Sequence, residues 1–254
     1  MTHEIVRHHD ADHLATETAA RLATSIALVQ ASFGSASIAL TGGRIAGALM
    51  FALADPMTAD AIDWSRLDLW WGDERYLPAG DSERNDFLAD TRLLSQVNSD
   101  PTRIHRICGP DQSESVLEAA LSYADKVTAA AQTRALDGRP AFDLVLLSIG
   151  PDGHIASLFP ESPSLTATDL VIAVHDSPKP PSNRVTLSFD ALNDSTEAWL
   201  LASGPEKANV VNLMLTQGAG PLQIPAAGVS AIERTLLLLD ESAAGQLSTD
   251  IGKR

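Results

Sequence analysis

Apolar residues recur along this chain in two patterns, which are stripes with helical spacing and short continuous runs. Residues 11–33 place Leu14, Leu22 and Ile26 on one face, which predicts an amphipathic helix capped by Asp10 or Asp12. A second long stripe predicts a helix over 113–136. Further helices are expected between the glycine pair at 42–43 and Leu53, from Asn85, at 205–216 and just after Asp240.

The continuous apolar runs between these helices predict strands. The segments "LVLL" and "TLLLL" are typical of strands that are buried on both faces. Strands that alternate with helices indicate an α/β fold, here a doubly wound, mostly parallel sheet with helices on both faces, and residues 1–254 are expected to form one domain. The predicted strands cover residues 37–40, 67–72, 104–107, 142–150, 170–174, 184–189, 197–203 and 235–240.

Composition and charge narrow the class of protein. The formal net charge of −15 opposes binding to nucleic acid or to an anionic membrane surface, since both need a basic footprint. No apolar run reaches the ~18 residues of a membrane span, and the N-terminus lacks the order of a signal peptide. The single cysteine, Cys108, is expected to be a buried, inert thiol and fits a reducing cytoplasm. A monomer or a small homo-oligomer is expected.

Three predicted strands end in residues that can take part in chemistry. In a doubly wound sheet, ligands bind beyond the carboxyl ends of the strands, so these ends predict one active site. They carry Thr41-Gly42-Gly43-Arg44, Gly72-Asp73-Glu74-Arg75 and Gly150-Pro151-Asp152-Gly153-His154.

The glycine pair at 42–43 would let backbone N–H groups approach an anion at a helix N-terminus, with Arg44 adding charge. A plain tight turn is the alternative, and G-x-G-x-x-G is absent. The charges of Asp73, Glu74 and Arg75 could be solvated charges of a surface loop. Against this, they follow a Trp-rich strand whose burial would require partners for them, and Asn85 could supply an amide contact.

His154 is a candidate general base near neutral pH, and Asp152 could orient its ring or contact substrate hydroxyls. A tight turn with a solvated histidine is the alternative. Lys207 lies near a helix N-terminus, an unfavourable place for a cation unless it faces an anion, and a solvated lysine on the face of the helix is the alternative. Arg184 is a further candidate cation, and Lys179 is a weaker one that solvation would explain.

Two other features are not interpreted as sites. The segment "HHDADH" at 8–13 is rich in possible metal ligands, but no complementary cluster follows, so a mobile terminus or a helix cap is expected instead of a metal site. Ser157 lacks the G-x-S-x-G context of a nucleophilic serine. We expect neither a metal nor another cofactor.

Four blocks, "WWGDERYLP", "LLSIGPDGHIASLFP", "PKPPSNRVTLSFDALN" and "LLASGPEKANVV", resemble the 6-phosphogluconolactonase family in sequence and in order. The resemblance implies a fold shared with glucosamine-6-phosphate deaminase and ribose-5-phosphate isomerase. It also implies hydrolysis of 6-phospho-D-glucono-1,5-lactone in the oxidative pentose phosphate pathway, with a small sugar-phosphate lactone as the partner molecule.

The resemblance also implies roles for the residues named above. Its catalytic pair would be His154, as the base that activates water, and Asp152. Substrate and phosphate would be bound by Gly42, Gly43, Arg44, Asp73, Glu74, Arg75, Asn85, Gly150, Gly153, Arg184 and Lys207. The chain departs from the usual Gly-Gly-Ser/Thr-Thr-Pro loop, since Arg44-Ile45-Ala46 follow its glycines, and Ile155 replaces the common Thr after the histidine.

Two other functions fit the same fold. An amino-sugar phosphate deaminase or isomerase is disfavoured by Asp-Glu-Arg, where deaminases tend to carry Asp-Glu-Tyr, and by "SLFP" after the histidine block. A sugar-phosphate sensor of the kind found in transcriptional regulators would need a helix-turn-helix module, for which this acidic chain has no room.

Overall fold

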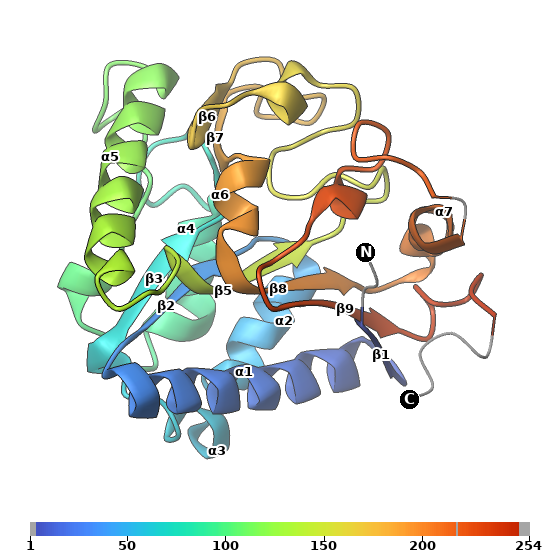
Figure 1. The fold of residues 1–254 in the computed structure, drawn as a ribbon, viewed down its shortest axis with the longest axis horizontal. Coiled ribbons are helices and arrows are strands. Elements are labelled where there is room, and N and C mark those ends of the chain that lie inside the picture. The colour runs from blue at the N-terminus through green and yellow to red at the C-terminus, as the bar shows by residue number, and fades with distance from the viewer. Residues whose placement is uncertain (1–3, 217, 249–254) are drawn as a thin grey trace.

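The computed structural model describes residues 4–216 and 218–248, and its centre is a six-stranded sheet (Figure 1). Every pair of neighbouring strands in this sheet is parallel, and the strand order is β1-β9-β8-β5-β2-β3. The first and last strands therefore lie side by side. The six strands are β1 (Glu4–His8), β2 (Ala36–Leu40), β3 (Leu67–Trp71), β5 (Phe142–Ser148), β8 (Ser195–Ala202) and β9 (Arg234–Asp240).

A second, three-stranded sheet is antiparallel, in the order β4-β7-β6. Its strands are β4 (Asp73–Arg75), β7 (Arg184–Leu187) and β6 (Val171–Val174). Because β4 follows β3 after the single residue Gly72, this small sheet extends directly from the edge of the large one. Its position brings Arg184 opposite Arg75, in register.

Helices lie on both faces of the large sheet, as the sequence pattern predicts. In the view of Figure 1, α1 (Ala11–Phe33) runs below the sheet, and α5 (Val116–Ala135) and the small sheet lie above it. The remaining α-helices are α2 (Arg44–Leu53), α3 (Pro56–Ala59), α4 (Asn85–Ala89), α6 (Phe189–Asn193) and α7 (Ala208–Thr216), and α4 continues into a π-helical turn, Asp90–Leu94. Short 3₁₀ turns cover Trp64–Arg66, Pro101–Arg103, Pro163–Thr166, Pro205–Lys207 and Pro225–Gly228.

Local sequence explains the clearest of these elements. The N-cap of α1 is Asp10, whose carboxylate accepts from the backbone N–H of His13 at 2.8 Å, and Gly34 ends the helix with φ +83°. Apart from Ser148, every residue of β5 is buried, as its apolar run predicts. Trp70 and Trp71 are also buried, which confirms that the Asp-Glu-Arg segment leaves a buried strand end.

The structure contradicts several expectations. Residues 104–107 form no strand, since only Ile104 makes a bridge, to Leu69, and residues 241–247 form turns where a helix is predicted. Residues 4–8 form β1, so this part of the N-terminus is not a mobile tail, whereas the other expectation for residues 8–13, a helix cap, is confirmed at Asp10. The predicted strands 170–174 and 184–189 exist, but they belong to the antiparallel sheet. Cys108 is a free thiol that is only partly buried.

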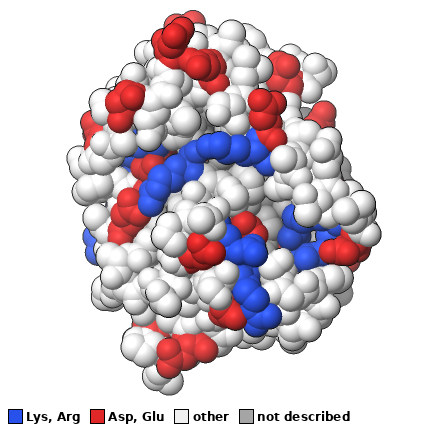
Figure 2. All heavy atoms as spheres, turned by 90° about the vertical axis from the view of Figure 1, so that its left-hand side faces the viewer, with Lys and Arg blue, Asp and Glu red and all other residues white. Residues whose placement is uncertain are grey.

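Acidic and basic side chains are interspersed on the surface. On the face drawn in Figure 2, Lys and Arg atoms gather across the middle with Asp and Glu atoms beside them. Among the described residues, no helix is both long enough and apolar enough to cross a membrane.

Candidate active site

The three chemically rich strand ends meet around one cavity of about 160 Å³. Of the sequence-predicted site residues, nine line it, whereas Arg44, Glu74, Asp152 and Gly153 do not. The nine are Gly42, Gly43, Asp73, Arg75, Asn85, Gly150, His154, Arg184 and Lys207.

The imidazole of His154 is held from behind by Asp152. Nδ1 of the ring is hydrogen-bonded to Oδ1 of Asp152, and the ring packs against Phe159 with the centroids 4.7 Å apart. Burial opposes ionisation of Asp152, but the hydrogen bond with His154 and the charges of His154 and Lys179 outweigh it and hold the pKa of this carboxyl well below its usual range. A carboxylate that occupies Nδ1 leaves Nε2 as the ring nitrogen available for chemistry.

The glycines of this loop make the arrangement possible. A Cβ on Gly150 would lie 2.6 Å from Oδ1 of Asp152 and closer still to the ring of His154. Gly153 has φ +84°, a conformation that favours glycine. Their amides are engaged within the molecule, because Gly150 N donates to His154 O at 2.8 Å and Gly153 N donates to Gly150 O at 3.0 Å.

The glycine pair at 42–43 opens helix α2 toward the cavity. Gly43 is the N-cap of α2 with φ +99°, and no side chain caps this end. A Cβ on Gly42 would collide with the side-chain amide of Asn85, so the loop and that amide are in close contact. The free N–H groups of a helix N-terminus attract anions, which makes this wall suited to a phosphate.

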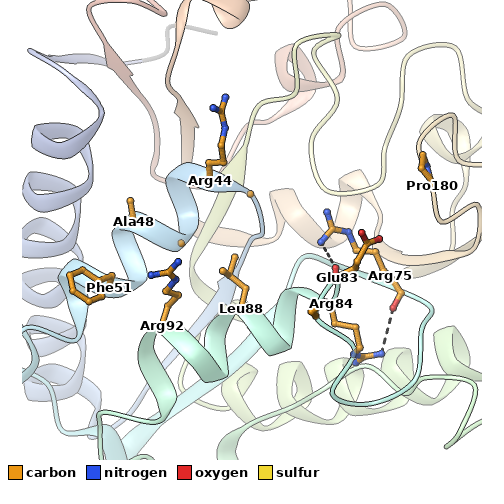
Figure 3. A pocket seen from close by; sticks show the side chains of 12 residues that line it. Arg44, Ala48, Phe51, Arg75, Glu83, Arg84, Leu88, Arg92 and Pro180 are labelled. Carbon is orange, nitrogen blue, oxygen red and sulfur yellow. Dashed lines mark hydrogen bonds between the residues drawn. The ribbon is translucent and has the colours of Figure 1, made fainter.

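Lys207 lines the same cavity from the turn before α7. Burial lowers its pKa, although Glu206 partly offsets that effect. Arg44 lies elsewhere: its side chain extends from the start of α2 (Figure 3). It is 90% exposed and pairs with Oε1 of Glu206 at 2.5 Å. It borders two larger cavities of about 870 and 450 Å³, which adjoin the central one at Gly43.

Asp73 lies in the wall of the cavity and is bound on several sides. Its Oδ2 accepts from Ser157 Oγ at 2.7 Å and lies 4.0 Å from Nη1 of Arg184, while Oδ1 accepts from Nδ2 of Asn85 at 3.2 Å. Ser157 thus supports Asp73. As the sequence indicates, it lacks the G-x-S-x-G context of a nucleophilic serine.

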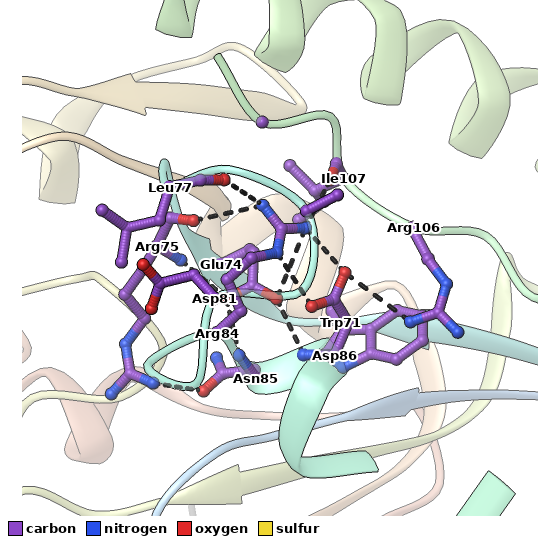
Figure 4. Close-up of polar contacts among 12 residues, drawn as sticks. Trp71, Glu74, Arg75, Leu77, Asp81, Arg84, Asn85, Asp86, Arg106 and Ile107 are labelled. Atoms are coloured by element: carbon purple, nitrogen blue, oxygen red, sulfur yellow. Dashed lines mark hydrogen bonds and ion pairs between the residues drawn. The ribbon is translucent and has the colours of Figure 1, made fainter. Parts of the chain in front are cut away.

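Glu74 points away from the cavity and anchors helix α4. Its carboxylate accepts from the backbone N–H groups of Asn85 at 2.7 Å and Asp86 at 2.8 Å, the first residues of that helix. Arg84, whose side chain is 1% exposed, donates to Asp86 at 2.7 Å and lies 3.8 Å from Glu74 (Figure 4). Burial raises the pKa of Glu74 to about 7, although the charge of Arg84 and the two N–H donors act against that rise.

Arg75 is directed by the same segment. Its Nη1 donates to Asn85 Oδ1 and to Glu83 O, both at 2.7 Å (Figures 3 and 4). Asn85 therefore joins Asp73 to Arg75 and holds the guanidinium at the cavity.

Arg184 lines the cavity but makes most of its contacts with the Pro-rich loop. Its Nη2 donates to the carbonyls of Lys179 at 3.2 Å and Pro180 at 2.9 Å, and its Nε donates to Pro181 O at 3.2 Å. The guanidinium therefore fixes the backbone that carries Lys179.

No motif in the sequence indicates a role for Arg84 or Ser148, and the sequence favours solvation for Lys179. Ser148 lines the cavity and donates from Oγ to Gly42 O at 2.8 Å, which ties the end of β5 to the glycine loop. The polar loop 73–84 carries Arg84 among other charged residues, so no sequence signal separates it from them. Within residues 4–216 and 218–248, no group of three His, Cys, Asp or Glu side chains is placed to hold a metal ion.

Comparison with known proteins adds an independent observation. Residues 9–238 match the family model for glucosamine-6-phosphate isomerases/6-phosphogluconolactonase. The chain is 49% identical to a 6-phosphogluconolactonase of Streptomyces coelicolor over 249 residues, covering 97% of this chain and 95% of the relative. It is 43% identical to one of Mycobacterium tuberculosis, covering 94% of this chain and 96% of the relative.

Solved structures agree with the fold. The crystal structure of 6-phosphogluconolactonase from Thermotoga maritima is similar with a TM-score of 0.79 and 25% identity, over 94% of this chain and all of that one. A monomeric glucosamine-6-phosphate deaminase shares the fold with a TM-score of 0.77 at 20% identity, over 95% of this chain and 99% of that one. With these matches along nearly its whole length, the chain belongs to the glucosamine-6-phosphate isomerase/6-phosphogluconolactonase family.

Proposed function

We propose that this protein is a lactone hydrolase that converts 6-phospho-D-glucono-1,5-lactone to 6-phospho-D-gluconate in the oxidative pentose phosphate pathway. One observation carries the proposal: a histidine oriented by a carboxylate lines the same cavity as a lysine and an open helix N-terminus. The high identity to proteins named 6-phosphogluconolactonase supports it.

The phosphate binds at the wall formed by Gly42, Gly43 and Lys207. Free N–H groups of α2 and the ammonium of Lys207 supply the favourable charge, and Arg184 adds a cation from the facing wall. Arg44 borders the two adjoining cavities and is paired with Glu206, so it adds positive charge near the phosphate only from outside the central cavity. Ser148 provides a hydroxyl beside the glycine loop. The loop itself has Arg44 and Ile45 where the usual family loop has hydroxyl-bearing Ser or Thr residues.

His154 acts as the general base through Nε2, with Asp152 holding Nδ1. A water molecule between Nε2 and C1 of the lactone attacks the carbonyl carbon as its proton passes to Nε2. The ester bond to the ring oxygen then breaks, and Nε2 returns the proton to that oxygen, so the base is regenerated. Binding the phosphate at a fixed distance from His154 supplies the orientation, which is a large part of catalysis.

Arg75 is our assignment for the group that stabilises the tetrahedral oxyanion. The amides of Gly150 and Gly153 are used within their own loop, whereas Arg75 faces the cavity and is held in place by Asn85 and Glu83. A preorganised cation of this kind stabilises developing negative charge without reorganising. Asp73 lines the substrate wall, and Glu74 acts indirectly by anchoring α4.

The test is an assay with fresh lactone, corrected for the spontaneous rate. His154→Ala should lower kcat by about 10²–10⁴-fold while leaving binding of 6-phosphogluconate largely intact. Lys207→Ala should instead raise KM. Lys126→Met, on the exposed side of α5, is the control. Wild-type turnover of the His154 variant would reject the mechanism, and activity on glucosamine 6-phosphate alone would reject the function.

Further proposals concern the protein as a whole. We propose that residues 1–254 act as one domain, which the pairing of β1 with β9 supports, and that the enzyme works in the cytoplasm as a monomer or small homo-oligomer. A single cysteine is compatible with a reducing compartment, and a formal charge of −15 disfavours nucleic acid as a partner.

A further inference from the structure

Lys179 reaches the rear of the His154–Asp152 pair from the Pro-rich loop. Its Nζ lies 3.2 Å from Oδ2 and 3.3 Å from Oδ1 of Asp152, and 3.1 Å from Nδ1 of His154. It also lies over the ring of Phe159, 5.8 Å from the centroid, against which His154 packs. One ammonium group therefore contacts both members of the pair and the aromatic ring beside them.

This contact lies outside the substrate cavity. Lys207 lines the cavity, whereas Lys179 does not, and the Lys179 side chain is 39% exposed. Exposed ion pairs add little to stability. The position of Lys179 consequently matters more for the geometry of the pair than for the fold or for contact with the lactone.

The loop that carries Lys179 is held in place. The three bonds from Arg184 bind the carbonyls of residues 179–181, and Ser177 Oγ donates to Lys179 O at 2.9 Å. A lysine on a fixed backbone has fewer conformations to lose when its ammonium binds a carboxylate. This support distinguishes Lys179 from a freely solvated lysine.

The charge on Nζ bears on which nitrogen of His154 carries the proton. An ammonium has donors and no acceptor, so it stabilises Asp152 as an ionised acceptor through Oδ2. Oδ1 then remains to accept from Nδ1–H, and the lone pair is placed on Nε2, toward the substrate. If Lys179 instead donated to Nδ1, the proton would lie on Nε2 and the ring could not act as a base from that side.

We propose that Lys179 is a positioning residue that completes a Lys179–Asp152–His154 triad and sets the base-competent tautomer of His154. This inference rests on the proposed function, because it assigns His154 the role of base. The other charged groups that line the cavity together with His154 are Asp73, Arg75, Arg184 and Lys207. They line the side of the substrate, whereas Lys179 and Asp152 approach Nδ1.

Two variants separate positioning from other roles. Lys179→Met keeps the length of the side chain and removes the charge, and we expect kcat to fall by about 10-fold or more, since base catalysis as a whole is worth roughly 10²–10⁴-fold. KM should change little, because Lys179 does not line the cavity. Lys179→Arg should recover a large part of kcat, and Lys126→Met should match the wild type.

A spectroscopic readout tests the tautomer without any turnover. In ¹⁵N NMR of the histidine-labelled protein, with His154→Gln used for assignment, wild-type His154 should show a protonated Nδ1 and an unprotonated Nε2 at a pH where the ring is neutral. In Lys179→Met this tautomer should lose population. A protonated Nε2 in the wild type, or a spectrum unchanged by the substitution, would overturn the proposal.

The kinetic outcomes are equally decisive. A rise in KM with kcat unchanged would make Lys179 a substrate ligand, and unchanged kinetics would make it a solvated lysine; both contradict a positioning role. Thermal unfolding of each variant checks that the protein is folded. If the wild type failed to hydrolyse the lactone, the proposed function would fall, whereas the NMR result would still decide how Lys179 and Asp152 set the state of His154.

Discussion

Gly150→Ala tests how closely the catalytic loop is fitted to His154. The added Cβ would lie 2.6 Å from Oδ1 of Asp152 and nearer still to the imidazole, whereas ordinary contacts begin at about 3.4 Å. The carboxylate must therefore retreat by about 0.8 Å, the difference between 3.4 and 2.6 Å, and the ring must retreat further. Gly150 is not in the left-handed region, so the backbone itself accepts alanine.

A displacement of about 1 Å at a reacting group can cost on the order of 10²-fold in rate. We therefore expect kcat for lactone hydrolysis to fall by about 10²-fold in Gly150→Ala. The three atoms nearest to the new methyl group belong to His154 and Asp152 and not to the phosphate wall at Gly42, Gly43 and Lys207, so binding of 6-phosphogluconate, measured by calorimetry, should stay near the wild-type value.

The matched control is Gly220→Ala, because a Cβ at Gly220 meets no atom of the described residues within 4 Å and its backbone is also outside the left-handed region. This variant should hydrolyse the lactone at the wild-type rate. A folded Gly150→Ala protein with wild-type kcat would refute both the position of His154 and its role as the base.

Three further predictions concern the support of the site. Arg84→Met should lower the free energy of unfolding by about 3–5 kcal/mol in chemical denaturation, because it removes the buried cation nearest to Asp86 and Glu74 and leaves Asp86 only the half-exposed Arg106 at 3.6 Å; a loss below about 1 kcal/mol would contradict the network. Tyr123→Phe removes the hydroxyl that both accepts from Trp71 N and donates to Trp71 O, and should cost about 1–3 kcal/mol in the same assay. Glu74 has a raised pKa of about 7 in the folded protein, so its contribution to stability is full below about pH 4.5 and is lost as the pH rises through 7. Glu74→Gln should flatten this part of the stability profile, and an unchanged slope between pH 4.5 and 7 would argue that Glu74 is ionised throughout.

Much of the large sheet could be predicted from local pattern. The apolar stripe of 11–33 and the continuous run in β5 each reflect burial of a single element, so periodicity finds them. The chemically active residues at the strand ends could also be identified, because they come directly after β2, β3 and β5, whose apolar runs are visible in the sequence. Strand β1 could not be predicted from local pattern, because only Ile5 and Val6 are apolar in it. It forms by pairing with β9, which lies near the other end of the chain.

The roles of the charged residues could be predicted only in part. Asp73, Glu74 and Arg75 read as one signature, but strand β4 alternates their directions, so Asp73 and Arg75 line the cavity and Glu74 faces the start of α4. Arg44 follows the glycine pair in sequence, yet the first turn of α2 carries its side chain away from the cavity to Glu206. Neighbours in sequence thus have different partners, and only the backbone direction decides which.

The sequence by itself determined the α/β class, the buried strands and the loop that offers His154, because each depends on residues close together in the chain. Only the tertiary structure decided that Lys179 contacts Asp152 and Nδ1 of that histidine. Lys179 lies 27 residues from Asp152 along the chain. It reaches Asp152 because Arg184, the first residue of β7 in the small antiparallel sheet, fixes the backbone of the Pro-rich loop. Contacts between distant loops depend on how sheets and helices pack, and no periodicity in the sequence records them.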